Sequence, residues 1–168
     1  MRVFLNMPDT VTPDVRSRMM AGIRGKDTRP EMMVRRALHR LGFRFRLHDA
    51  RLPGRPDIVL PRHRAAVLVH GCFWHGHGCH MFRWPASRAG FWRDKIGRNQ
   101  SRDAAAFLEM DALGWRQAVI WECALSGRGR LPVDQVADIC ALWLRDGGRH
   151  LEIAGFACTL ETPPAQPE

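Results

Sequence analysis

The feature that most constrains the fold is an apolar run, AAVLV, which spans Ala65 to Val69 and ends against His70. The run does not alternate with polar residues, so it predicts a strand that is covered on both faces. Similar short runs occur at 57–60 (DIVL) and 115–121 (WRQAVIW). These segments predict an α/β protein with a central sheet flanked by helices.

Three helices and a further strand are expected around these runs. The first helix follows Thr28, because TRPE places a proline in the first turn and Glu31 three residues after a capping threonine. The segment 43–48, FRFRLH, alternates apolar and basic residues and predicts a half-buried strand. Helices are predicted over 98–113 and 132–146. This order favours a meander of three strands, with a fourth strand added beside them after a helical crossover.

The length of 168 residues corresponds to one domain. Prolines are concentrated near both ends, so we expect a loose segment over 1–15, one domain over 16–160 and a disordered tail over 161–168. The longest apolar stretch, 65–69, is too short to cross a membrane, and the first residues lack the pattern of a signal peptide. The expected location is cytoplasmic.

The charge balance points to a polyanionic partner. The chain has 26 basic and 17 acidic side chains, which give a net charge of +9. Such an excess is typical of nucleic-acid binding, with a membrane surface as the alternative partner. The five cysteines are an odd number in a chain expected in the cytosol, which favours metal binding or free thiols over disulfides.

The densest cluster of reactive side chains is HGCFWHGHGCH, from His70 to His80. Cys72, His77 and Cys79 have a spacing suited to zinc, and Cys123, just after the 115–121 strand, could complete a tetrahedral site. A closed site with four protein ligands is structural and not catalytic. The alternative is a pair of free core cysteines beside solvent-facing histidines.

Four further residues are candidates for catalysis. Asp57 begins an otherwise apolar strand, where an ionised carboxylate needs a cation such as Mg²⁺; the alternative is an aspartate that caps the LPGRP turn. His70 and His75 flank the cysteine loop, and either could transfer a proton, act as a spare zinc ligand or only hydrogen-bond within the loop. Glu31 is explained by its capping box, yet helical spacing also places it at the edge of the buried arc.

Four segments together carry a family resemblance. GRPDIVL, VHGCFWHGHGCHMF, FWRDKIGRNQSRD and LGWRQAVIWECAL resemble, in order and spacing, the very short patch repair (Vsr) DNA mismatch endonucleases, over about Ser17 to Arg130. The resemblance implies a restriction-endonuclease-like α/β core with a central mixed sheet and a structural zinc site. It also implies Mg²⁺-dependent nicking of one strand, 5′ to the thymine of a T·G mismatch that arises when 5-methylcytosine deaminates.

The resemblance also assigns roles to individual residues. Asp57 matches the metal-binding aspartate, and the main-chain carbonyl at Val69, where better studied relatives carry threonine, matches a second Mg²⁺ ligand. His75 matches the catalytic histidine, and His70 and Glu31 match supporting positions, with Asp103 a further candidate. The remaining matches are the structural zinc ligands Cys72, His77, Cys79 and Cys123, the inserted aromatics Phe73, Trp74 and Trp92, and Met20, which enters from the opposite groove.

The expected partner is double-stranded DNA with a T·G mismatch, together with mismatch-repair proteins and a cognate DNA cytosine methyltransferase system. A monomer is expected, because a mismatch nicker cuts one strand. One alternative is a zinc-stabilised DNA-binding module without catalysis, which gives no reason for Asp57 or His75. The other is a different restriction-like nuclease on the same core, which needs no aromatic wedge and usually acts as a dimer.

Overall fold

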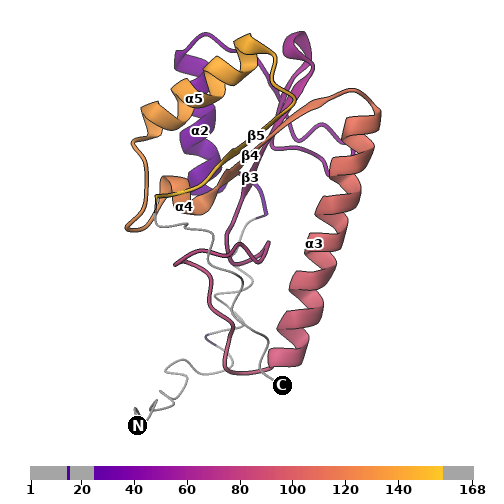
Figure 1. The fold of residues 1–168 in the computed structure, drawn as a ribbon, viewed down its shortest axis with the longest axis vertical. Coiled ribbons are helices and arrows are strands. Elements are labelled where there is room, and N and C mark those ends of the chain that lie inside the picture. The colour runs from indigo at the N-terminus through magenta and orange to yellow at the C-terminus, as the bar shows by residue number, and fades with distance from the viewer. Residues whose placement is uncertain (1–14, 16–24, 157–168) are drawn as a thin grey trace.

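A mixed five-stranded sheet in the order β1-β2-β3-β4-β5 forms the centre of the computed structural model (Figure 1). The strands are β1 (Arg46–Leu47), β2 (Ile58–Leu60), β3 (Ala65–His70), β4 (Arg116–Trp121) and β5 (His150–Ile153). The structure describes residue 15 and residues 25–156. The predicted loose segment 1–15 apart from Val15, the predicted tail 161–168, and Met20 therefore lie outside the described residues.

The strand pairing confirms the predicted meander and crossover. β1, β2 and β3 pair antiparallel in chain order, and β4 then pairs parallel to β3, with Ala65 opposite Arg116 and His70 opposite Trp121. The fifth strand, β5, was not predicted from the sequence. It pairs parallel to β4 at the edge of the sheet, and its alternating residues HLEI carry no apolar run that could have marked it.

Helices cover both faces of the sheet, as expected for strands with apolar residues on both sides. The helices are α2 (Arg29–Arg40), α3 (Ala89–Ala112), the short α4 (Glu122–Leu125) and α5 (Val133–Asp146). α2 and α5 lie side by side on one face, and α3 runs along the other face (Figure 1). Within the described part of the chain, no helix has the length and apolar character needed to cross a membrane.

Two predicted boundaries are wrong for physical reasons. α3 begins at Ala89 and not at residue 98. The prediction missed the first half of this helix because that half is mostly exposed, has only Ile96 buried, and therefore shows no apolar periodicity. The strand predicted over 43–48 is reduced to β1. Phe43 instead donates its backbone N–H to the carbonyl of Leu38 after the end of α2 and is buried in the core.

The burial of β3 changes along its length, and this change creates the site. Ala65, Ala66 and Val67 are fully buried, whereas the last three residues, 68–70, are partly exposed. The core lies mainly between the sheet and the helices α2 and α5. The carboxyl end of β3 therefore leaves the core and opens toward α3.

Candidate functional site

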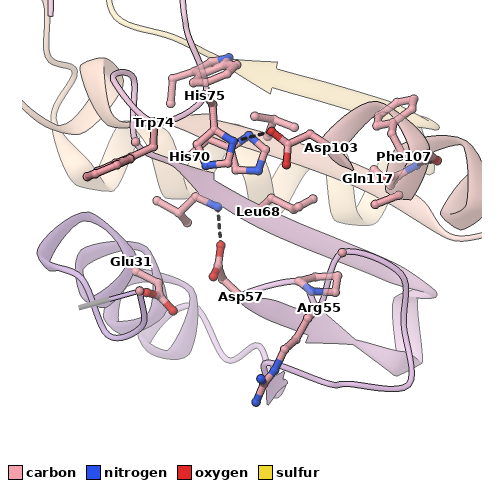
Figure 2. A pocket seen from close by; sticks show the side chains of 18 of the residues that line it. Glu31, Arg55, Asp57, Leu68, His70, Trp74, His75, Asp103, Phe107 and Gln117 are labelled. Atoms are coloured by element: carbon pink, nitrogen blue, oxygen red, sulfur yellow. Dashed lines mark hydrogen bonds and ion pairs between the residues drawn. The ribbon is translucent and has the colours of Figure 1, made fainter. Parts of the chain in front are cut away.

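A cleft of about 940 Å³ opens between the carboxyl ends of β3 and β4 and the helix α3 (Figure 2). Its walls include all the residues that the sequence analysis predicted for catalysis and for binding the catalytic metal, although these residues come from four separate segments. These residues are Glu31, Asp57, Val69, His70 and His75. Asp103, from the middle of α3, also lines the cleft.

Asp57 lies just before β2 and is directed toward β3 (Figure 2). Its Oδ2 accepts a hydrogen bond of 2.7 Å from the backbone N–H of Val69, so the two predicted metal-binding residues are neighbours. Burial raises the pKa of Asp57 to about 6, although the Val69 hydrogen bond opposes the shift. The carboxylate thus bonds across the sheet rather than within the LPGRP turn, and its environment favours an added cation.

His70 and His75 form a stacked pair. Their ring centroids are 3.9 Å apart, and the ring planes differ by 5°. Burial and the neighbouring His75 lower the pKa of His70 to about 4, so His70 is neutral at pH 7. His75 is also joined to α3, because its Nδ1 lies 2.5 Å from Oδ2 of Asp103 (Figure 2).

The contact with Asp103 decides what His75 can do. An ionised carboxylate only accepts hydrogen bonds, so it places the proton of neutral His75 on Nδ1 and leaves Nε2 free to accept another. The hydrogen bond from His75 holds the pKa of Asp103 below its ordinary value, although burial alone would raise it. A histidine with this support is suited to be a general base. Only the family resemblance pointed to Asp103, since nothing in its spacing marks it.

The loop that carries His75 is held against α3. Gly76 has φ +63°, and a Cβ at this position would lie 2.8 Å from Cγ2 of Ile96, so only glycine allows this close approach. The amide of Gln100 donates to the carbonyl of His75 at 3.2 Å, and Asn99 donates to that of Trp74 at 2.8 Å. These contacts fix the loop beside the cleft.

Glu31 has both of the features that its sequence position suggested. It completes the predicted capping box, with the Thr28 backbone N–H 3.1 Å from its Oε2. It is only 2% exposed, and it forms a buried ion pair with Arg35. The sequence interpretation missed Arg35, although the i,i+4 spacing of Glu31 and Arg35 on one helix was a usable signal. It also missed His48, whose Nε2 lies 3.2 Å from Glu31 Oε1.

The four predicted zinc ligands come together beside the cleft. One ligand atom from each residue lies within 4.8 Å of the others in the set Cys72, His77, Cys79 and Cys123. Nδ1 of His77 is 3.6 Å from the sulfur of Cys72 and 3.6 Å from that of Cys123, and both cysteines are fully buried. His77 also stacks on Trp121, with ring centroids 4.0 Å apart, and is only partly exposed. Three sulfurs and one imidazole are a donor set that can bind a metal ion.

The aromatic residues predicted to insert beside the mismatch as a wedge, Phe73, Trp74 and Trp92, form one cluster at the amino end of α3. The ring of Phe73 lies 5.3 Å from that of Trp74 and 5.1 Å from that of Trp92, and the ammonium of Lys95 is 5.3 Å from the Trp74 ring. Phe73, Trp74 and Trp92 are partly exposed and are not members of the main core. The sequence interpretation missed Trp84 and Phe91, two more exposed aromatics that extend the cluster.

The partly buried carboxylate of Asp57 and a histidine–aspartate pair thus share one cleft at the carboxyl ends of the central strands of a mixed α/β sheet. Together with the net charge of +9, this arrangement is that of an α/β nuclease. Comparison with known proteins agrees: the family model described as DNA mismatch endonuclease Vsr matches residues 8–81.

Two relatives extend the match over most of the chain. The type II nicking enzyme V.XorIIP of Xanthomonas oryzae pv. oryzae is 50% identical over 125 residues, which cover 74% of this chain and 92% of that enzyme. The DNA mismatch endonuclease Vsr of Escherichia coli K12 is 40% identical over 147 residues, which cover 88% of this chain and 94% of that protein. The chain therefore belongs to the Vsr family and is a DNA endonuclease, which is a hydrolase. Membership in this family contradicts the alternative of a non-catalytic DNA-binding module and implies a divalent metal.

Proposed function

We propose that this endonuclease nicks one strand of a duplex 5′ to the thymine of a T·G mismatch, in a reaction that requires Mg²⁺, and so acts on the product of 5-methylcytosine deamination. The observation that carries the proposal is the shared cleft, in which Asp57 is bonded to Val69 N–H and His75 is bonded to Asp103. The names of the relatives add support, since they describe one as a mismatch endonuclease and another as a nicking enzyme.

The side chain of Asp57 and the main-chain carbonyl of Val69 would hold the Mg²⁺. The fit rests on Asp57, a partly buried carboxylate with a raised pKa that gains a favourable charge partner when a cation binds. Bound there, Mg²⁺ supplies a positive charge that lowers the pKa of water and neutralises charge on a phosphate oxygen.

The protein's own residues handle the proton. Nε2 of His75 accepts the proton of the attacking water, and the carboxylate of Asp103 stabilises the imidazolium that results. His70 is neutral at pH 7, so it adds no positive charge to the ring on which it stacks. Glu31 supports the opposite wall of the cleft through its pairing with Arg35.

Cys72, His77, Cys79 and Cys123 would bind a structural zinc ion. The cluster connects the loop after β3 to Cys123 at the start of α4. A tetrahedral site closed by four protein ligands stabilises a loop without taking part in chemistry. The loop between the ligands carries Phe73, Trp74 and His75, so the zinc would hold both the wedge and the general base in place.

The aromatic cluster would recognise the weakly stacked mismatch. Phe73, Trp74 and Trp92, with Met20 from the opposite groove, would insert beside the T·G pair, which opens at lower cost than a matched pair. The excess of basic side chains supplies affinity for phosphates that does not depend on the DNA sequence. We also propose that the protein acts as a monomer, alongside mismatch-repair proteins and a cognate cytosine methyltransferase system.

The decisive test compares strand-labelled duplexes that contain T·G, matched C·G or other mismatches, with and without Mg²⁺. We expect a single nick 5′ to the thymine, only in the T·G duplex and only with Mg²⁺. Cleavage of both strands, or equal cleavage of matched DNA, would contradict the proposal and favour a different restriction-like nuclease.

A further inference from the structure

His48 occupies a position between the two walls of the cleft and has no role in the function proposed above. It follows β1 directly, lines the cleft, and its side chain is 14% exposed. Its φ of +48° is in the left-handed region, which histidine adopts more often than most residues but still rarely. The backbone is held there, because His48 N–H donates to the carbonyl of Asp57 at 3.4 Å and Arg55 Nε donates to the carbonyl of His48 at 3.1 Å.

The imidazole of His48 faces two of the acidic residues of the cleft. Its Nε2 lies 3.2 Å from Oε1 of Glu31, and its Nδ1 lies 3.7 Å from Oδ1 of Asp57. Oδ2 of Asp57 is already bonded to Val69, so His48 lies on the side of the other carboxylate oxygen. The ring thus bridges α2, which carries Glu31, and the segment before β2, which carries Asp57.

Arg35 determines which ring nitrogen of His48 carries the proton. Nη2 of Arg35 lies 2.7 Å from Nε2 of His48 and also bonds to Glu31. A guanidinium can only donate, and its contact with Nε2 is shorter than the 3.2 Å contact of Glu31 Oε1 with the same atom. Nε2 therefore accepts from Arg35, and the proton of the neutral ring is on Nδ1, the nitrogen nearer Asp57. The distance of 3.7 Å from His48 Nδ1 to Asp57 Oδ1 is longer than a hydrogen bond. The N–H group of His48 therefore acts on the carboxylate only as a nearby dipole.

We propose that His48 is a positioning residue for the metal-binding carboxylate: with Arg35, it fixes the orientation of Asp57 relative to Glu31 and so raises the affinity of the cleft for a divalent cation. This inference rests on the proposed function, since it assumes that Asp57 binds the metal. Groups that orient a ligand in this way commonly change metal affinity by about 10–100-fold when they are removed.

The experiment measures Mn²⁺ binding to the zinc-loaded, DNA-free protein by electron paramagnetic resonance, and nicking of T·G duplex as a function of Mg²⁺ concentration. His48→Ala should weaken Mn²⁺ binding about tenfold and raise the Mg²⁺ requirement by a similar factor, with the maximal rate recovered at high Mg²⁺. His48→Gln should stay within about threefold of the wild type, because an amide can accept from Arg35 and donate toward Asp57. His39→Ala, at an exposed histidine on α2, is the matched control and should change neither value.

The outcomes separate this inference from the proposed function. If Asp57→Asn binds Mn²⁺ as tightly as the wild type, Asp57 is not a metal ligand and both proposals fail. If Asp57→Asn loses binding but His48→Ala keeps wild-type metal affinity, only the role of His48 is overturned. A lower melting temperature of His48→Ala with unchanged Mn²⁺ affinity would likewise show a structural role and overturn the inference. Equal losses of Mn²⁺ affinity in His48→Ala and His48→Gln would contradict the inference that His48 acts by accepting from Arg35 and by directing its N–H toward Asp57.

Discussion

Nδ1 of His75 lies 2.5 Å from Oδ2 of Asp103, which joins a loop residue to a helix residue 28 positions further along the chain. The pair does for His75 what no local contact in its glycine-rich loop provides. It selects the tautomer, orients the ring and prepares a counter-charge for the protonated form.

Asp103→Asn should reduce the nicking rate by about 10²–10⁴-fold, because the amide no longer stabilises the imidazolium and can favour the wrong tautomer. Binding of T·G duplex should change little, since the basic residues and the aromatic cluster remain. Single-turnover nicking together with equilibrium binding checks both values. His75→Ala should show a loss of similar size, and the double variant should be no worse than either single one. Additive losses would mean that the two residues act separately.

Asp57→Asn should reduce the nicking rate by several orders of magnitude and leave DNA binding nearly intact, because it removes a metal ligand without altering the basic surface. The change should also stabilise the metal-free fold above pH 6. The raised pKa of Asp57, about 6, means that its favourable contribution is present below pH 4 and is lost as pH rises through 6. Asparagine cannot ionise and avoids this loss.

The size of the effect follows from the shift in pKa. Relative to the wild type, Asp57→Asn should gain up to about 3 kcal/mol of unfolding free energy between pH 4 and pH 7. Denaturant unfolding of both proteins, in Mg²⁺-free buffer at several pH values, measures this difference. A pH-independent difference would show that Asp57 is not destabilised by burial.

Cys123→Ser should lower the zinc content and the melting temperature together, because metal binding at a closed site is part of the folding free energy. One zinc per chain is expected in the wild type after EDTA treatment and gel filtration. Cys140→Ala is the matched control, since Cys140 is equally buried but lies outside the cluster, and this variant should keep its zinc. A zinc-free wild type with an unchanged melting temperature would contradict the site.

Trp74→Ala should weaken binding to T·G duplex by about ten- to a hundredfold, since stacking of a base on an aromatic ring contributes about 1–3 kcal/mol. Binding to matched duplex depends on phosphate contacts and should change far less. The melting temperature should barely change, because Trp74 packs on Phe73 and Trp92 outside the main core.

A fluorescent base analogue beside the mismatch reports the unstacking directly. Trp143→Ala provides the contrast: Trp143 is a core residue, only 7% exposed, and its loss should lower the melting temperature without changing the preference for T·G. If Trp74→Ala instead behaves like the Trp143 variant, the wedge must be sought at Trp92 or Met20.

Features that depend on neighbours in the chain were predictable from the sequence. The start of α2 follows from the local capping box between Thr28 and Glu31, and β3 and β4 follow from apolar runs that need cover on both faces. The four-residue metal cluster was predictable too, because three of its ligands lie within eight residues and the fourth follows a predicted strand.

Only the tertiary structure decided which charged groups meet across the cleft. The pairing of His75 with Asp103, and the placement of His48 between Asp57 and Glu31, join residues from different elements, and no periodicity or spacing encodes such contacts. The exposed first half of α3 and the edge strand β5 were also missed, because neither segment carries an apolar pattern along the chain that could mark it. The sequence alone determined the central strands and the chemistry of the donors, because local hydrogen bonding and apolar burial leave patterns along the chain. The geometry of the cleft depends on long-range packing, which leaves none.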